Sequence, residues 1–162
     1  MLSASFLHLL LLIITANASP ILVHKLLGRQ YNHAIDTGKR FFDGQPLLGH
    51  SKTWRGLIGS VLVTAIVAIL LGYDATVGAA IGLLAMTGDL LSSFIKRRLK
   101  LPPSSMAPLI DQIPESFLPA VVMANIFGLD GKSVSVLVIV FIVFELAVSV
   151  ILYRWGIRQR PY

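Results

Sequence analysis

The hydrophobic residues of this chain are grouped into five long runs. The runs cover roughly residues 2–27, 56–71, 75–95, 114–129 and 133–155, and short polar turns lie at 72–74 and 130–132. A membrane-spanning helix needs about 20 residues, within a range of about 17 to 25. The pattern therefore predicts an all-α integral membrane protein with five transmembrane helices. The second and fourth runs are marginally short, so we expect those helices to be tilted or shielded by their neighbours.

Composition supports this class. The chain is 55% hydrophobic and 14% charged, whereas a soluble domain is about 25% charged. Its length of 162 residues predicts one membrane-embedded domain over residues 1–162. It contains no cysteine, which excludes disulfides, thiolate metal sites and a catalytic thiol. The net charge of +6 would suggest nucleic acid in a soluble protein, but here the cations cluster between and after the apolar runs, so we expect no nucleic acid partner.

The distribution of lysine and arginine predicts the orientation. Thirteen of the 14 lie within 25–55, 96–100 and 154–160, and only Lys132 lies in a turn on the other side. The positive-inside rule then places the N-terminus outside and the C-terminus in the cytoplasm of a multi-pass cell-membrane protein. Two cytoplasmic loops, about 28–55 and 96–113, hold most of the polar residues. Ala16-Asn17-Ala18 resembles a signal-peptidase site, but no cation precedes the leucine run, so we expect the first helix to be retained.

An acidic residue, Asp89, lies near the end of the third apolar run. An ionised carboxylate loses its hydration in lipid, and intramembrane acids usually mark function. Asp89, Ser93, Lys96 and Arg97 share one helix face because they lie at i, i+4, i+7 and i+8. This stripe suits the binding of a metal and a phosphate where lipid meets water. The alternatives are a structural partner for Asp89 on another helix and a purely topological role for the cations.

The first loop ends in Ser51-Lys52-Thr53-Trp54-Arg55, just before the second helix. Ser51 and Thr53 supply hydroxyls near a helix N-terminus, where free N–H groups and the helix dipole attract anions. Lys52 and Arg55 add positive charge. A helix cap flanked by topological cations is an equally good interpretation of this segment.

Two further acids, Asp111 and Glu115, lie four residues apart at the start of the fourth helix. They either cap this helix and complement its dipole, or meet Asp89 around a cation. Three carboxylates together with phosphate oxygens suit Mg²⁺, with Mn²⁺ as a possible substitute. Glu145 in the fifth helix has no motif around it, so we interpret it as structural.

These motifs resemble those of the CTP-dependent phosphatidate cytidylyltransferase superfamily. The matching segments are Ser51–Trp54, Gly88–Arg97 and Ile110–Gln112, although the superfamily's Lys-Asp pair and His-Gly-Gly segment are missing. Residues 36–44 (Asp-Thr-Gly-Lys-Arg-Phe-Phe-Asp-Gly) and the short basic tail resemble the CDP-archaeol synthase branch. The resemblance covers roughly residues 32–115 plus the tail. It implies CTP as donor, Mg²⁺ as cofactor and an isoprenoid ether lipid phosphate as acceptor.

The resemblance also leads to a hypothesis for each site residue. Asp89, Lys96 and Asp111 are the catalytic candidates, and Asp89, Asp111 and Glu115 are the metal-ligand candidates. The candidates for binding CTP or phosphate are Lys39, Asp43, Ser51, Lys52, Thr53, Arg55, Ser93 and Arg97. Three alternatives stay open: phosphatidic acid as the acceptor, a small transporter that uses Asp89 and Glu145, and a non-catalytic membrane scaffold. The sequence does not indicate an oligomeric state.

Overall fold

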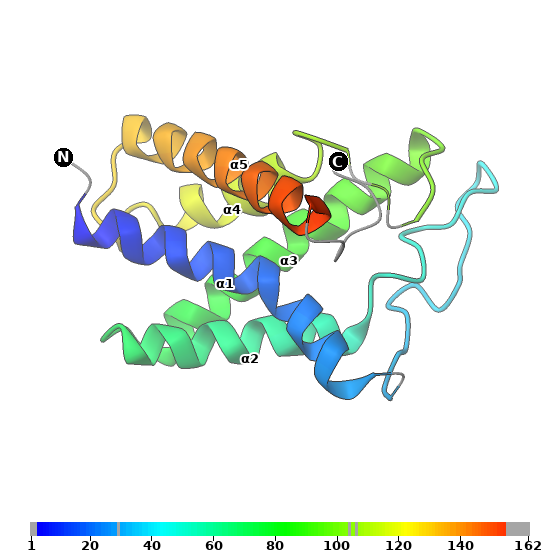
Figure 1. Ribbon diagram of the computed structural model, residues 1–162, viewed down its shortest axis with the longest axis horizontal. Helices are drawn as coiled ribbons and strands as arrows, with labels where there is room; N and C mark the ends of the chain where they lie inside the picture. The colour runs from blue at the N-terminus through cyan, green and yellow to red at the C-terminus, as the bar shows by residue number, and fades with distance from the viewer. Residues whose placement is uncertain (1–2, 29, 104, 106, 155–162) are drawn as a thin grey trace.

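The structure, a computed structural model, describes residues 3–28, 30–103, 105 and 107–154. Its helices are α1 (Ala4–Leu27), α2 (Trp54–Leu70), α3 (Ala75–Arg98), α4 (Gln112–Met123) and α5 (Gly131–Arg154). They lie against one another as a bundle, and the long loop over residues 30–53 extends from one end of it (Figure 1). The all-α class is confirmed, since the described residues form only two isolated β-bridges, Ala34 with Thr53 and Arg40 with Pro46.

Three of the helices are long and apolar enough to cross a membrane: α1, α3 and the Gly131–Ile151 part of α5. Helix α2 is apolar but slightly shorter, at 17 residues. The predicted span over 114–129 is wrong in extent, because α4 has 12 residues and is about 18 Å long, less than the roughly 30 Å hydrocarbon core.

Helix α4 ends early because the chain turns back after it. The amide of Leu129 donates to the carbonyl of Ala124, and Gly128 has a φ of 62°. A residue in this left-handed conformation stops a helix at little cost when it is glycine. The basic tail from 155 onward lies outside the described residues.

Helix α3 packs closely against α2 through small residues. A Cβ on Gly82 would lie 2.9 Å from the Cα of Val61, and one on Gly78 would lie 2.7 Å from the Cα of Ala65. Small residues of this kind let helix backbones approach in a membrane. On α2, the buried Ser60 hydroxyl donates to the Ala16 carbonyl of α1 at 2.8 Å.

The apolar core fills one end of the bundle. It is built from the first turns of α1, α3 and α5 and from the ends of α2 and α4, with Leu9, Ile81 and Leu137 fully buried. At this end the ring pair of His8 and Tyr73 also links α1 to the α2–α3 turn. The opposite end carries the two long loops, and there polar side chains take the place of the apolar core.

The contact between α3 and α4 yields a first prediction. A Cβ on Gly88 would collide with the Pro114 carbonyl, and the neighbouring backbone has no room to move away. Gly88→Ala should therefore destabilise the protein by about 1–3 kcal/mol, as overpacked sites do. Thermal unfolding in detergent measures this effect. Gly131→Ala is the matched control, since a Cβ there meets nothing within 4 Å, and equal stability of the two variants would contradict the prediction.

Candidate active site

A cavity of about 540 Å³ lies at the loop end of the bundle, between α1, α3, α4, α5 and the 50–55 segment. Eight of the predicted site residues line it: Ser51, Lys52, Thr53, Arg55, Asp89, Lys96, Asp111 and Glu115. Pro20 and Ile21 of α1 and Met86 of α3 give the cavity an apolar wall. The same space therefore offers cations, carboxylates and an apolar surface.

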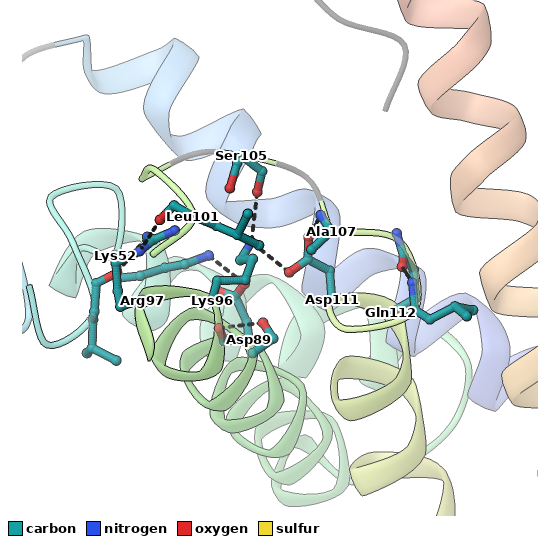
Figure 2. Close-up of polar contacts among 12 residues, drawn as sticks. Lys52, Asp89, Lys96, Arg97, Leu101, Ser105, Ala107, Asp111 and Gln112 are labelled. Atoms are coloured by element: carbon teal, nitrogen blue, oxygen red, sulfur yellow. Dashed lines mark hydrogen bonds and ion pairs between the residues drawn. The ribbon is translucent and has the colours of Figure 1, made fainter. Parts of the chain in front are cut away.

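Two ion pairs occupy the polar side of the cavity (Figure 2). Lys52 Nζ lies 2.5 Å from Asp89 Oδ1, which joins the first loop to α3. Lys96 Nζ lies 2.6 Å from Asp111 Oδ1, which joins α3 to the segment before α4. Each pair links a loop to α3, and removing one partner of a largely buried pair leaves the charge of the other uncompensated.

Glu115 is brought next to Asp89 by the close packing of α4 on Gly88. The Glu115 side chain is buried and interacts electrostatically with Asp89, Glu145 and Lys52. Glu145 also lines the cavity, and it is not without an interaction partner. No sequence motif surrounds Glu145, so it was interpreted as structural. Only the packing of α5 brings it to the cavity that Asp89 and Glu115 also line.

The predicted metal ligands are brought together only in part. Within the described residues, no group of three acids, histidines or cysteines has the arrangement of a metal cage. Asp111 Oδ2 accepts from the Ala107 amide at 3.0 Å and its Oδ1 pairs with Lys96. Mg²⁺ commonly binds one or two carboxylates and completes its shell with phosphate oxygens and water. Asp89 and Glu115 fit that donor set. Asp111 remains a candidate ligand, although in the structure its carboxylate is paired with Lys96.

Arg97, a predicted phosphate contact, lies in a different environment. It is 2% exposed and is not among the residues that line the cavity. Its guanidinium donates to the carbonyls of Leu101 at 2.8 Å, Pro102 at 2.7 Å and Leu48 at 3.3 Å. Arg97 therefore ties the second loop to the first.

The predicted nucleotide contact Asp43 lies 3.2 Å from Arg98 Nε, outside the cavity lining. The Arg98 guanidinium also lies over the rings of Phe41, at 4.5 Å, and Phe94, at 4.8 Å. Such cation–π contacts are favourable within about 6 Å. This cluster fastens the tip of the first loop to the end of α3.

Four other predicted phosphate or nucleotide contacts also differ in their surroundings. Thr53 accepts from the Gly56 amide and so caps α2, while still lining the cavity. Lys39 is exposed, and Ser93 is 1% exposed; neither lines the cavity. Arg55 lines the cavity, although its donors already have partners: the Gly28 and Gln30 carbonyls, His24 Nδ1 and Asn32 Oδ1.

Asp36 has a role that the sequence reasoning missed. Its carboxylate accepts from the amides of Gly38 at 3.0 Å, Leu48 at 2.9 Å and Gly49 at 2.8 Å. Burial raises the pKa of this carboxyl, but the hydrogen bonds from Gly49, Leu48 and Gly38 outweigh it and hold the pKa below its ordinary value. The Asp-x-Gly spacing typical of an Asx-turn was the available signal. Asp36 fixes the backbone just before Ser51 and Lys52.

Comparison with known proteins identifies the family. The family model described as "CarS-like: CDP-archaeol synthase" matches residues 1–77 and 73–162. This chain belongs to the CDP-archaeol synthase family. A protein of Thermofilum pendens named CDP-archaeol synthase is 33% identical over 154 residues, which is 91% of this chain and 75% of that protein.

Other CDP-archaeol synthases show the same relationship. The protein of that name from Hyperthermus butylicus is 43% identical over 108 residues, which cover 62% of this chain and 60% of the relative. This chain thus spans less than two thirds of the Hyperthermus protein's length. A solved structure described as an intramembrane enzyme for archaeal membrane lipids biosynthesis matches with a TM-score of 0.72 and 27% identity, over 87% of this chain and 90% of the other. This similarity supports a membrane protein.

The Asp36 hydrogen bonds yield a second prediction. Asn cannot accept all three amides, because its NH₂ group turns a donor toward one of them, so Asp36→Asn should cost about 1–3 kcal/mol at pH 7. The folded-state pKa lies below the unfolded one, so this stabilisation is complete above about pH 4 and is lost as the pH falls through the folded value.

Thermal unfolding of the wild type and the Asp36→Asn variant at pH 7 and near pH 3 shows whether this stabilisation depends on the charge of Asp36. We expect a clear difference in midpoint at pH 7 that shrinks in acid. Asp74→Asn is the control, since Asp74 is exposed and makes no side-chain cap hydrogen bond. A difference between wild type and Asp36→Asn that is the same at both pH values would rule out the charge-dependent account.

Proposed function

We propose that this chain transfers CMP from CTP to 2,3-bis-O-(geranylgeranyl)-sn-glycerol 1-phosphate, giving the CDP-lipid and pyrophosphate. The observation that carries the proposal is that the Lys52–Asp89 pair and the apolar residues Pro20 and Ile21 of α1 line the same cavity. Such a space suits a substrate with a phosphate head and an apolar tail. Family membership supports the donor and acceptor, because the relatives are named CDP-archaeol synthase.

The reaction needs little covalent chemistry from the protein. An oxygen of the lipid phosphate attacks the α-phosphorus of CTP, the bond between that phosphorus and the β-bridging oxygen breaks, and pyrophosphate leaves. The lipid phosphate is already an anion, so the protein does not need a general base. Its task is to hold two anions together and to balance the charge that develops on the leaving group.

In this proposal the side chains on the cavity divide that task. The ammonium groups of Lys52 and Lys96 would contact the triphosphate or the lipid phosphate, and the Ser51 hydroxyl would donate to a phosphate oxygen. Asp89 and Glu115 would hold a Mg²⁺ ion, with Asp111 as a further candidate. A bound Mg²⁺ supplies charge neutralisation on the phosphate oxygens.

The membrane arrangement follows from the same proposal. The isoprenoid chains would remain in the bilayer beside Pro20 and Ile21 while the phosphate reaches the polar side of the cavity. We propose a five-segment topology with the N-terminus outside and the active site on the cytoplasmic face of the cell membrane. The shorter α2 and α4 are supported by their packing on α3. This topology would place the cations of both long loops on that face, in keeping with the positive-inside rule.

The most direct test of the reaction supplies CTP labelled at the α-phosphate, Mg²⁺ and one lipid at a time to the purified protein. We expect the label in the geranylgeranyl ether lipid and little in phosphatidic acid. Label only in phosphatidic acid would move the chain to the diacyl branch. No label in either lipid, with the protein folded, would contradict the proposed activity.

Replacement of Asp89 tests the site within that assay. Asp89→Asn keeps the shape of the side chain but removes the charge that binds Lys52 and the metal, so turnover should fall at least about 100-fold. Asp130→Asn, an exposed position at the opposite end of the bundle, serves as the control. Substantial turnover by a folded Asp89→Asn protein would remove Asp89 from the reaction.

A further inference from the structure

The two ion pairs on the cavity differ in how firmly they are held. Lys96 Nζ also donates to the Ser105 carbonyl at 2.9 Å, and Asp111 Oδ2 accepts from the Ala107 amide. The two side chains are 8% and 12% exposed. Four groups therefore hold one another in place, and this pair braces the segment that leads into α4.

The Lys52–Asp89 pair is held by fewer contacts. Within the described residues, the hydrogen bonding of Lys52 Nζ is confined to Asp89 Oδ1, at 2.5 Å. The side chains are 20% and 19% exposed, and both line the cavity. In the described part of the chain no backbone group holds this ammonium, so its flexible stem allows it to leave the carboxylate without breaking the fold.

The charges around Asp89 favour such an exchange. Glu115 lies beside Asp89 and also interacts electrostatically with Lys52, so two acidic side chains lie near the Lys52 ammonium. A divalent cation balances two adjacent carboxylates better than one ammonium does. It coordinates oxygen at about 2.1 Å, where it would repel an ammonium on the same oxygen. Metal and Lys52 therefore compete for Asp89.

We propose that Lys52 is an exchangeable counter-ion of Asp89: it occupies the carboxylate that a divalent cation requires and moves to substrate phosphate when that cation binds. Lys96 stays on Asp111 as a brace. The movement of Lys52 to a substrate phosphate rests on the proposed function, whereas the competition between Lys52 and a divalent cation for Asp89 does not. Metal and polyphosphate each take one partner of the same pair, so each binds more readily when the other is present.

The experiment measures Mn²⁺ binding to the purified full chain by electron paramagnetic resonance, without CTP or lipid. Lys52→Met removes the competing ammonium, so the Mn²⁺ dissociation constant should fall at least about fivefold, the lower end of typical coupling between sites. Lys52→Arg keeps a cation and should stay near wild type. Lys52→Gln is a second neutral variant in case Lys52→Met does not fold.

Three controls separate competition from general electrostatics. Lys25→Met removes an exposed cation near the same end of the bundle and should not change Mn²⁺ affinity. Lys96→Met removes a cation that both Asp111 and the Ser105 carbonyl hold, so it should lower thermal stability and tighten Mn²⁺ binding less than Lys52→Met does. Adding Asp89→Asn to Lys52→Met should abolish the increase in Mn²⁺ affinity.

The proposal is overturned if folded Lys52→Met and Lys52→Gln bind Mn²⁺ no more tightly than wild type, including no measurable binding. It is also overturned if Lys25→Met gives the same gain. These results are independent of catalysis, since neither substrate is present. Tighter Mn²⁺ binding by the neutral Lys52 variants, together with a wild type that transfers no label, would support the exchange and contradict the proposed function alone.

Discussion

The arrangement of this protein around its cavity depends on the cost of placing a carboxylate, Asp89, near the end of an apolar helix. An ionised group in that position must be paired. Lys52 provides the charge from a distant loop, at 2.5 Å, and this requires the first loop to fold back over α3. Gly88, one residue earlier, admits the backbone of α4 and with it Glu115. One helix position thus gathers the polar groups of three segments.

The two long loops are held by charged side chains because they have too few apolar residues for a core of their own. Asp36 holds the amides of Leu48 and Gly49, and Arg97 holds the Leu48 carbonyl from the opposite side. Arg55 fastens the start of the first loop through the Gly28 and Gln30 carbonyls. Charge-assisted hydrogen bonds of this kind are stronger than neutral ones. They position Ser51 and Lys52 at the mouth of the cavity.

Much of the fold could be predicted from the sequence, because apolar runs of membrane length leave few alternatives to helices. The cost of burying Asp89 also drew attention to a residue that lines the cavity, where Lys52 and Lys96 lie beside carboxylates. The short extent of α4 was not foreseen, since its apolar run continues to Leu129 and only the backbone conformation at Gly128 reveals the turn.

The roles of individual cations could not be predicted, because helical spacing places Arg97 and Lys96 on one face without saying what each meets. Arg97 lies against backbone carbonyls of both loops, whereas Lys96 reaches Asp111. The wall that α1 contributes through Pro20, Ile21 and His24 was equally hidden. The face that an apolar helix turns inward is set by its neighbours, and no motif marked these positions.

In the proposed function, donor, metal and lipid phosphate meet at Asp89 inside the cavity. An experimental structure of the protein with Mn²⁺ and a non-hydrolysable CTP analogue, with Mn²⁺ located by anomalous scattering, tests it most directly. We expect Mn²⁺ within coordination distance of Asp89 and of the triphosphate, with Lys52 moved onto a phosphate oxygen. A triphosphate bound outside the cavity, or a metal bound away from Asp89, would contradict it.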